Sequence, residues 1–371
     1  MQKVVWIVMA ILFLSCVEKY DFNVVNEKQG IVINASISDL SFFDSLNFPS
    51  DGRYFKVVLK ALNDVDNVRD EPITGAVVRL ESDAGGSWVY TENAMSAGEY
   101  VLLDEQFKAQ PSLAYRLVVE MENGVSFHST WESMPEGGNA LGGFHIEEDN
   151  PYEYVYYANE PVGRQVDGFN LYTHFEASQN KGYYKWTYDP LWVYQAPLEP
   201  DLNSPKKTCW VRTPFYLDDV VLFDANNIKE GFDQKLFFAK THGNERMYIY
   251  FSALIHQEKI SKEYYQFWQD LEAQKDKGGL YDQPPFGVGT NFESDDENWT
   301  VNGYFGVIDE ECTRWTFEPF DLSYGIENNL YEYCLTFVPP DFSDQCHDCR
   351  AYNMGESVNV PPIWWNRRLG Q

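Results

Sequence analysis

The chain has 371 residues and a formal net charge of −29 at pH 7, with 23% of its residues charged. This acidity argues against binding to nucleic acids or to anionic membrane surfaces, because both require clustered Lys and Arg. Aromatic residues make up 16% of the chain, which supplies ample core material and excludes an intrinsically disordered protein. The length predicts two domains.

The first residues have the pattern of an export signal. Lys3 is followed by an unbroken apolar run over residues 4–14 and then by Ser15 and Cys16. The run is too short to cross roughly 30 Å of hydrocarbon as a helix, which favours a signal peptide over a membrane span. We expect residues 1–15 to be the signal peptide, Cys16 to carry the lipid anchor, and residues 16–30 to form a lipidated tether. The alternative is an ordinary secretory signal followed by a cysteine that stands there by chance.

An alternating apolar pattern begins at residue 31. Ile31, Ile33, Ala35 and Ile37 are separated by single residues, as in a half-buried strand. Turn signals separate further strands, which are expected at residues 54–61, 76–81, 88–91, 100–103, 115–120 and 125–130. Short strands at this spacing predict an antiparallel β-sandwich over residues 31–135, similar to immunoglobulin-like or transthyretin-like modules.

Four glycines within residues 137–143 mark the best domain boundary. The following part, residues 144–371, is again aromatic and predicts a larger β-rich domain. Its strands are expected at residues 166–178, 182–188, 191–194 and 248–255. The predicted fold class is therefore mainly β, with a sandwich followed by a larger β-rich domain.

One clear helix is expected in the second domain, at about residues 261–277. Ser261 can cap its N-terminus, and Gly278 can close its C-terminus. The apolar side chains that fall on one face of this helix are Tyr264, Phe267, Trp268 and Leu271.

If Cys16 carries the lipid, five cysteines remain. An exported chain meets an oxidising compartment, so disulfides are the expected state. The odd number leaves one thiol free or paired outside the chain. We expect Cys312 to pair with Cys334, since each lies in or beside a strand-like segment, and Cys209 to pair with either Cys346 or Cys349.

The motif formed by Cys346, His347, Asp348 and Cys349 has other possible roles. A zinc or copper site would need two further ligands, and the sequence has no second CxxC. Thioredoxin-like chemistry needs the motif to open a helix in an α/β context, but the flanks here are loop-like. Structural disulfides are favoured, and we expect no metal or cofactor, with Cys346, His347 and Cys349 as the remaining metal candidates.

Motifs of catalysis are absent from the sequence. The six histidines are scattered, and there is no nucleophile elbow, no phosphate-binding loop and no dinucleotide-binding fingerprint. Aromatic clusters, at residues 152–157 and at Trp364 and Trp365, are interpreted as core or interface residues, with a ligand platform as the alternative. We expect a protein that is not an enzyme.

Several blocks of the sequence together resemble a known family. They are Cys16 with its preceding residues and residues 75–78, 98–100, 209–210, 261–268, 278–282, 284–285, 291, 303–305, 346–349 and 361–364. The chain is similar to a family of Bacteroidota lipoproteins described only as a domain of unknown function, number 4249. The resemblance covers almost the whole chain after the signal, although Cys312 and Cys334 stand outside the family's pattern.

The resemblance implies a lipoprotein of the outer membrane, of a kind often encoded beside TonB-dependent receptors. Glu18 and Asp21, shortly after Cys16, resemble the signals that send such lipoproteins to the cell surface, so we expect the protein to face the cell exterior. Such a protein would partner an outer-membrane β-barrel, for substrate capture or for capping, without catalytic residues. One alternative in the same compartment is an accessory subunit of the machinery for outer-membrane protein assembly or secretion. Another is a glycan-active hydrolase with two carboxylates across a cleft.

Overall fold

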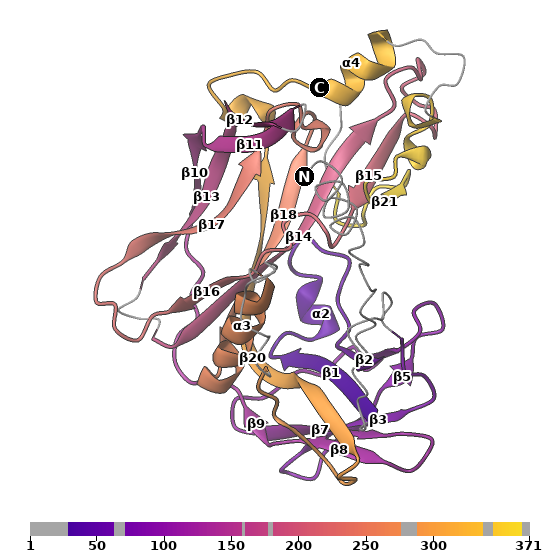
Figure 1. Ribbon diagram of the computed structural model, residues 1–371, viewed down its shortest axis with the longest axis vertical. Coiled ribbons are helices and arrows are strands. Elements are labelled where there is room, and N and C mark those ends of the chain that lie inside the picture. The colour runs from indigo at the N-terminus through magenta and orange to yellow at the C-terminus, as the bar shows by residue number, and fades with distance from the viewer. Residues whose placement is uncertain are drawn as a thin grey trace, which may run out of the picture.

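The computed structural model describes residues 29–62, 71–157, 160–176, 181–275, 288–336 and 344–365. The predicted signal peptide, Cys16 and most of the predicted tether lie outside these residues. Within them the protein is mainly β (Figure 1), which confirms the predicted fold class.

Two facing sheets form a sandwich from the N-terminal part of the chain. One contains β1 (Gln29–Ser38), β2 (Lys56–Ala61), β5 (Thr91–Glu92) and β6 (Glu99–Val101). The other contains β3 (Val77–Ser82), β4 (Ser87–Val89), β7 (Ala114–Glu120), β8 (Ser126–Ser129), β9 (Glu132–Ser133) and β19 (Phe292–Ser294). The alternating apolar side chains of both sheets meet in one core, among them Ile33, Leu59 and Leu117. This arrangement is compatible with the predicted immunoglobulin-like or transthyretin-like sandwich.

The first of these sheets continues into the C-terminal part of the chain as one ten-stranded sheet. Beyond β1 its strands are β20 (Trp299–Phe317), β18 (Phe251–Ile260), β14 (Tyr183–Gln195), β15 (Thr208–Arg212) and β21 (Glu356–Val358), and β16 (Val221–Asp224) pairs with β14. β1 and β20 run parallel, with Ile33 opposite Gly303. Glycine is required here, since its φ is +94° and a Cβ would lie 2.1 Å from Ile33 O.

β20 contributes to three separate cores. Phe305 and Val307 lie in the core of the sandwich, whereas Tyr304 and Ile308 point to the other face, against a helix. Phe317, at the far end, lies in the C-terminal core. The boundary predicted at residues 137–143 falls between β9 and β10, but the two sides of it share this strand.

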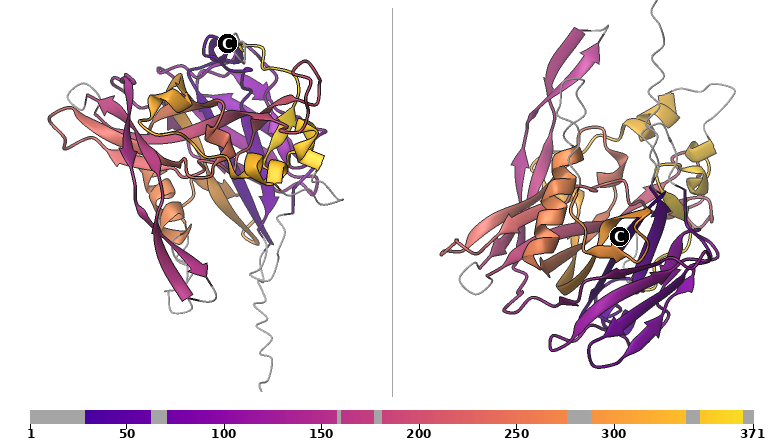
Figure 2. Two further views of the ribbon diagram at one scale, coloured as in Figure 1. Left: turned by 90° about the horizontal axis from the view of Figure 1, so that it is seen from above. Right: turned by 60° about the horizontal axis from the view of Figure 1, so that its bottom comes forward.

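A three-stranded sheet covers one face of the C-terminal half of the long sheet. Its strands are β10 (Phe144–Asp149), β13 (Gly168–Phe175) and β17 (Phe232–Lys240). Phe169 on β13, Trp186 on β14 and Phe251 on β18 are fully buried in the core between the layers. A separate hairpin of β11 (Tyr152–Tyr157) and β12 (Glu160–Gln165) extends away from the sheets (Figure 2).

Helices are few and short among the described residues. α2 (Phe42–Ser45) lies between β1 and β2, α3 (Lys262–Lys275) follows β18, and α4 (Asn329–Thr336) follows β20. Four short 3-10 helices are η1 (Glu245–Met247), η2 (Pro319–Asp321), η3 (Asp344–Cys346) and η4 (Cys349–Ala351).

The predicted helix is α3. The Tyr264 amide donates to Ser261 Oγ at 3.2 Å, which confirms the predicted N-cap. The predicted apolar face packs against β20, with Tyr264 stacked on Tyr304 at a ring distance of 4.8 Å. Gly306 permits this approach, because a Cβ there would lie 2.5 Å from the Tyr264 ring. Gly278 and the predicted last residues of the helix lie outside the described residues.

Candidate functional site

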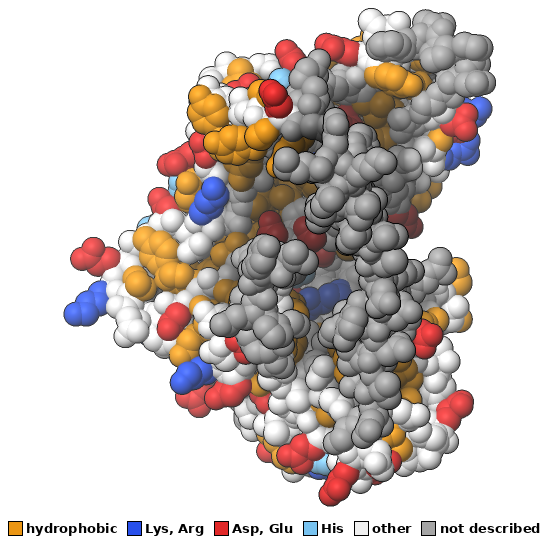
Figure 3. All heavy atoms as spheres, viewed as in Figure 1, with side chains coloured by type: hydrophobic (Ala, Val, Ile, Leu, Met, Phe, Trp, Pro, Cys, Tyr) orange, Lys and Arg blue, Asp and Glu red, His pale blue; other side chains and the backbone are white. Residues whose placement is uncertain are grey.

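A cavity of about 720 Å³ lies where the β1–β2 connection meets the long sheet. Its walls come from residues 40–53, from one face of β14, β18 and β20, from residues 212–216 and from the C-terminal residues 353–364. Figure 3 shows a hollow between the upper and lower parts of the molecule in which acidic and basic side chains lie together. The cavity therefore joins segments that are far apart in sequence.

The floor of the cavity is a polar stripe on one face of the long sheet. The register sets His256 on β18 opposite Cys312 on β20, with Leu254 opposite Arg314. Because side chains two residues apart share a face, Glu310 and Arg314 flank Cys312 on this side. Asp189 on β14 lies opposite Leu254, which brings its carboxylate to the same stripe.

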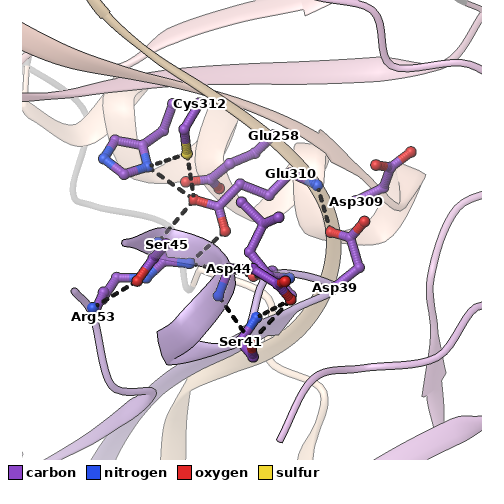
Figure 4. A network of polar contacts seen from close by, with 12 residues as sticks. Asp39, Ser41, Asp44, Ser45, Arg53, Glu258, Asp309, Glu310 and Cys312 are labelled. Carbon is purple, nitrogen blue, oxygen red and sulfur yellow. Dashed lines mark hydrogen bonds and ion pairs between the residues drawn. The ribbon is translucent and has the colours of Figure 1, made fainter. Parts of the chain in front are cut away.

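Arg53 reaches this floor from the β1–β2 connection. α2 in that connection has a capping box: Ser41 Oγ accepts the Asp44 amide at 3.0 Å, and Asp44 Oδ2 accepts the Ser41 amide at 3.1 Å. Ser45 Oγ, at the end of α2, accepts the Arg53 amide at 3.0 Å (Figure 4). The helix thus fixes the backbone from which the guanidinium extends.

Five ionisable groups form a continuous network on the floor, and Figure 4 shows Arg53, Glu310 and Cys312 within it. Arg53 donates through both terminal nitrogens to the two oxygens of Glu310, at 2.8 Å for Oε1. His256 Nδ1 lies 2.8 Å from Glu310 Oε1, and His256 Nε2 lies 3.1 Å from Asp189 Oδ2. Cys312 Sγ lies 3.1 Å from His256 Nδ1 and donates to Glu310 Oε1 at 3.3 Å.

The network determines the ionisation of its members. Burial opposes the charge on Glu310, but the Arg53 charge and the His256 hydrogen bond hold the pKa of this carboxyl well below its ordinary value. Burial likewise opposes protonation of His256, but its contacts with Asp189, Cys312 and Glu310 raise the imidazole pKa well above the ordinary value. Burial raises the pKa of the Cys312 thiol to about 11. Without a bound ligand the floor therefore contains an imidazolium, a carboxylate and a neutral thiol.

The rim of the cavity combines cations with aromatic rings. Arg314 lies over the Trp364 ring at 4.3 Å, and burial lowers the pKa of this guanidinium to about 10. Arg212 and Asp51, which also line the cavity, form an ion pair. Trp364 and Trp365 pack with Leu191, Val193, Trp210 and Tyr250 in one apolar cluster. This packing agrees with the interpretation of the two tryptophans as core or interface residues.

The structure corrects one predicted disulfide and supports another. Cys209 is bonded to Cys349, as one of the two predicted alternatives has it. The predicted bond between Cys312 and Cys334 is wrong, because Cys334 lies on α4 and is bonded to Cys346. Cys312 is the free, buried thiol, since its strand directs it to the charged floor instead.

The CxxC motif bonds to two different partners. Cys346 and Cys349 do not bond to each other, and neither sulfur is available to a metal or to redox exchange with its neighbour. His347 between them is exposed. The motif ties the C-terminal segment to α4 and to β15 at once.

The tyrosine cluster predicted to be core or interface is exposed. Tyr152, Tyr154 and Tyr156 on β11 are 68%, 75% and 80% exposed, so a core role is excluded. Tyr154 lies opposite Gly163 and Tyr156 opposite Pro161, and these small partners leave the rings uncovered. Glu153 connects the hairpin to β17, because its carboxylate accepts a hydrogen bond from Lys240 at 2.7 Å.

The sequence did not predict the floor of the cavity. His256 is one of six scattered histidines, and Cys312 was expected in a disulfide. The available signal was period-two spacing of polar residues within buried strands: His256 and Glu258 on β18, and Glu310, Cys312 and Arg314 on β20.

Comparisons with known proteins place the chain in a family. No curated protein and no solved structure matches it. A family model described as a domain of unknown function, DUF4249, matches residues 17–314, which include the sandwich and the polar stripe up to Arg314. Within the described residues, no helix is long and apolar enough to cross a membrane. The match spans well over half of the sequence, and the chain therefore belongs to the DUF4249 family.

Proposed function

We propose that the chain is a lipid-anchored accessory protein on the outer face of the outer membrane, which captures a ligand for a β-barrel such as a TonB-dependent transporter. The cavity is the observation that carries this proposal. Its volume of about 720 Å³ is in the range of small-molecule sites, and its charged floor and aromatic wall provide orientation and apolar contact. We propose capture without a catalytic step.

The anchor in this proposal is Cys16. The family model begins at residue 17, directly after it, which is consistent with a mature protein that starts at the cysteine. Several acyl chains on one residue give stable attachment, because each buried CH₂ contributes about 0.8 kcal/mol.

The surface for the barrel in this proposal is the tyrosine face of the β11–β12 hairpin. Tyr152, Tyr154 and Tyr156 line one side of a two-stranded sheet, and the ring of Tyr154 lies above Gly163. Tyrosine is enriched at protein interfaces, because its ring provides a large contact area at a low cost in conformational entropy. The hairpin also carries the charged residues Glu153, Glu160 and Arg164, which suit a surface that is exposed before the partner binds.

Affinity purification tests this proposal. The full-length lipoprotein carries a C-terminal tag and is purified from its native membrane in mild detergent. One integral β-barrel protein is expected at close to equal amounts, and its recovery falls at least about tenfold when Tyr152, Tyr154 and Tyr156 are all replaced by Ser. A matched variant, Phe320→Ser, changes a residue that is 94% exposed outside the hairpin and keeps the barrel.

Two outcomes contradict the proposal. If no barrel is recovered in any mild detergent, the proposed barrel partner is contradicted. If many unrelated barrels are recovered, the result favours an accessory subunit of the assembly machinery instead. A loss of the barrel in the Phe320→Ser control would show that the hairpin is not the specific contact.

A further inference from the structure

The floor of the cavity brings together three atoms that are common metal ligands. His256 Nδ1, Glu310 Oε1 and Cys312 Sγ are separated by 2.8, 3.1 and 3.3 Å. Their residues are 6%, 2% and 4% exposed, and they lie on the adjacent strands β18 and β20. The three donor atoms therefore lie together in a buried part of the cavity wall.

We propose that His256, Glu310 and Cys312 bind a divalent transition metal ion, with zinc as the best match. An imidazole nitrogen, a carboxylate oxygen and a thiolate sulfur are the three donor types found in zinc sites. A tetrahedral zinc ion with bonds of about 2.0–2.3 Å separates its donors by roughly 3.3–3.5 Å. The three atoms need to move apart by roughly 0.5 Å or less to accommodate the ion.

The surroundings of the three ligands match those of metal sites. His256 Nε2 contacts Asp189, and a histidine ligand normally donates its second ring N–H to such a carboxylate. Arg53 holds Glu310 through both carboxylate oxygens, which fixes the orientation of the ligand. Each carboxylate oxygen has two acceptor positions, so Oε1 can keep Arg53 Nη1 while it binds the metal.

The ion would be bound by the thiolate of Cys312 and the neutral imidazole of His256, so the protons on these two donor atoms pass to solvent when it binds.

His256, Glu310 and Cys312 all line the cavity, and no fourth His, Cys, Asp or Glu of the described residues joins this group. An ion held by these three would have its remaining coordination position open to the cavity. Three protein ligands and an open position are the arrangement of zinc sites that bind water or an exogenous ligand. The metal would thus provide the point at which a captured molecule is held, although metal binding itself does not depend on the proposed barrel partner.

Cobalt substitution tests the site in the full-length protein purified in detergent. Co²⁺ alone is added, and binding is followed by the thiolate-to-metal charge-transfer absorption and by the d–d bands of tetrahedral cobalt. We expect one equivalent to bind and Zn²⁺ to displace it. In the same protein, Zn²⁺ is expected to slow the reaction of Cys312 with a thiol reagent, since no other free thiol exists among the described residues.

Variants assign the ligands. Cys312→Ser is expected to abolish the charge-transfer absorption, and Asp189→Asn, which leaves all three ligands in place, to weaken zinc binding by about 10–100-fold. Glu311→Gln is the matched control, because Glu311 is the exposed neighbour of Glu310 on the same strand. Its zinc affinity should equal that of the unmodified protein.

The proposal is overturned if the unmodified protein shows no thiolate-to-cobalt absorption, or if zinc fails to protect Cys312. It is equally overturned if Cys312→Ser and Asp189→Asn bind zinc as tightly as the Glu311→Gln control. The first two measurements use the unmodified chain, so a folding defect in a variant cannot decide the result.

Discussion

At the scale of single residues, a second buried pair lies beside the cavity floor. Lys185 on β14 and Glu258 on β18 are 5% and 6% exposed, and their charged atoms are 2.5 Å apart. The Lys185 ammonium also lies 4.4 Å from the Trp268 ring of α3. Burial opposes the charge on Lys185, but Glu258 raises the pKa of this amine above its ordinary value, so the amine keeps its charge.

Removing one partner of this pair is expected to destabilise the protein strongly. Lys185→Met leaves the Glu258 carboxylate buried without its counter-charge, at an expected cost of about 3–5 kcal/mol in the free energy of unfolding. The double variant Lys185→Met with Glu258→Leu should recover most of this loss, because neither charge remains. Urea denaturation measures both values.

An exposed pair supplies the control. Lys56 pairs with Glu99 at 3.1 Å and is 52% exposed in its side chain, so Lys56→Met should cost less than about 1 kcal/mol. Equal costs for Lys185→Met and Lys56→Met would contradict this account of the buried pair.

At the scale of elements, alternation and turn signals predicted most strands of the sandwich and the helix α3. The strand predicted at residues 115–120 is β7 within one residue, and Ser261 caps α3 as expected. The extent of β20 was not predicted, because both of its faces are buried over residues 303–308 and the apolar alternation disappears there. The parallel pairing of β20 with β1 could not be predicted either, because a contact between distant strands leaves no local signal in the sequence.

The same limit explains why the sequence did not predict the cavity floor or the partner of Cys334. Glu310 and Cys312 share a face of β20, but His256 becomes their neighbour only through the register of β18 and β20, which no local pattern specifies. The predicted pairing of Cys334 assumed a strand, but the segment is the helix α4.

The two disulfides are expected to stabilise the protein unequally. Cys209–Cys349 closes a separation of 140 residues, whereas Cys334–Cys346 closes only 12. Loop-closure entropy predicts losses of about 5 and about 3 kcal/mol when each bond is removed by paired Cys→Ser changes. Urea denaturation of the two double variants tests the order, and a larger loss for the short loop would contradict it.

At the scale of the whole molecule, β20 couples the N-terminal and C-terminal halves. It adds Phe305 and Val307 to the sandwich core, and it carries Glu310 and Cys312 to the cavity. The sandwich is therefore incomplete without residues that follow the larger C-terminal part. The cavity depends on both halves, since Arg53 comes from one and His256 from the other.

A fragment that ends at the predicted boundary should not fold. Residues 29–140 lack β19 and β20, which leaves one edge of each sheet unpaired and part of the core exposed. The fragment is expected to unfold without a cooperative transition in urea. Joining residues 288–309 to it through a flexible linker should restore the transition, and a cooperative transition in the fragment alone would contradict the coupling.

Site-specific photo-crosslinking in intact cells tests most directly whether the chain works against a barrel. A photoreactive amino acid replaces Tyr154 on the hairpin or, as the control, Tyr331 on α4, which is 41% exposed. The predicted result is a crosslink from position 154, and none from position 331, to an integral β-barrel of the outer membrane. Absence of a barrel crosslink from position 154, or equal crosslinking from both positions, would contradict the proposed function.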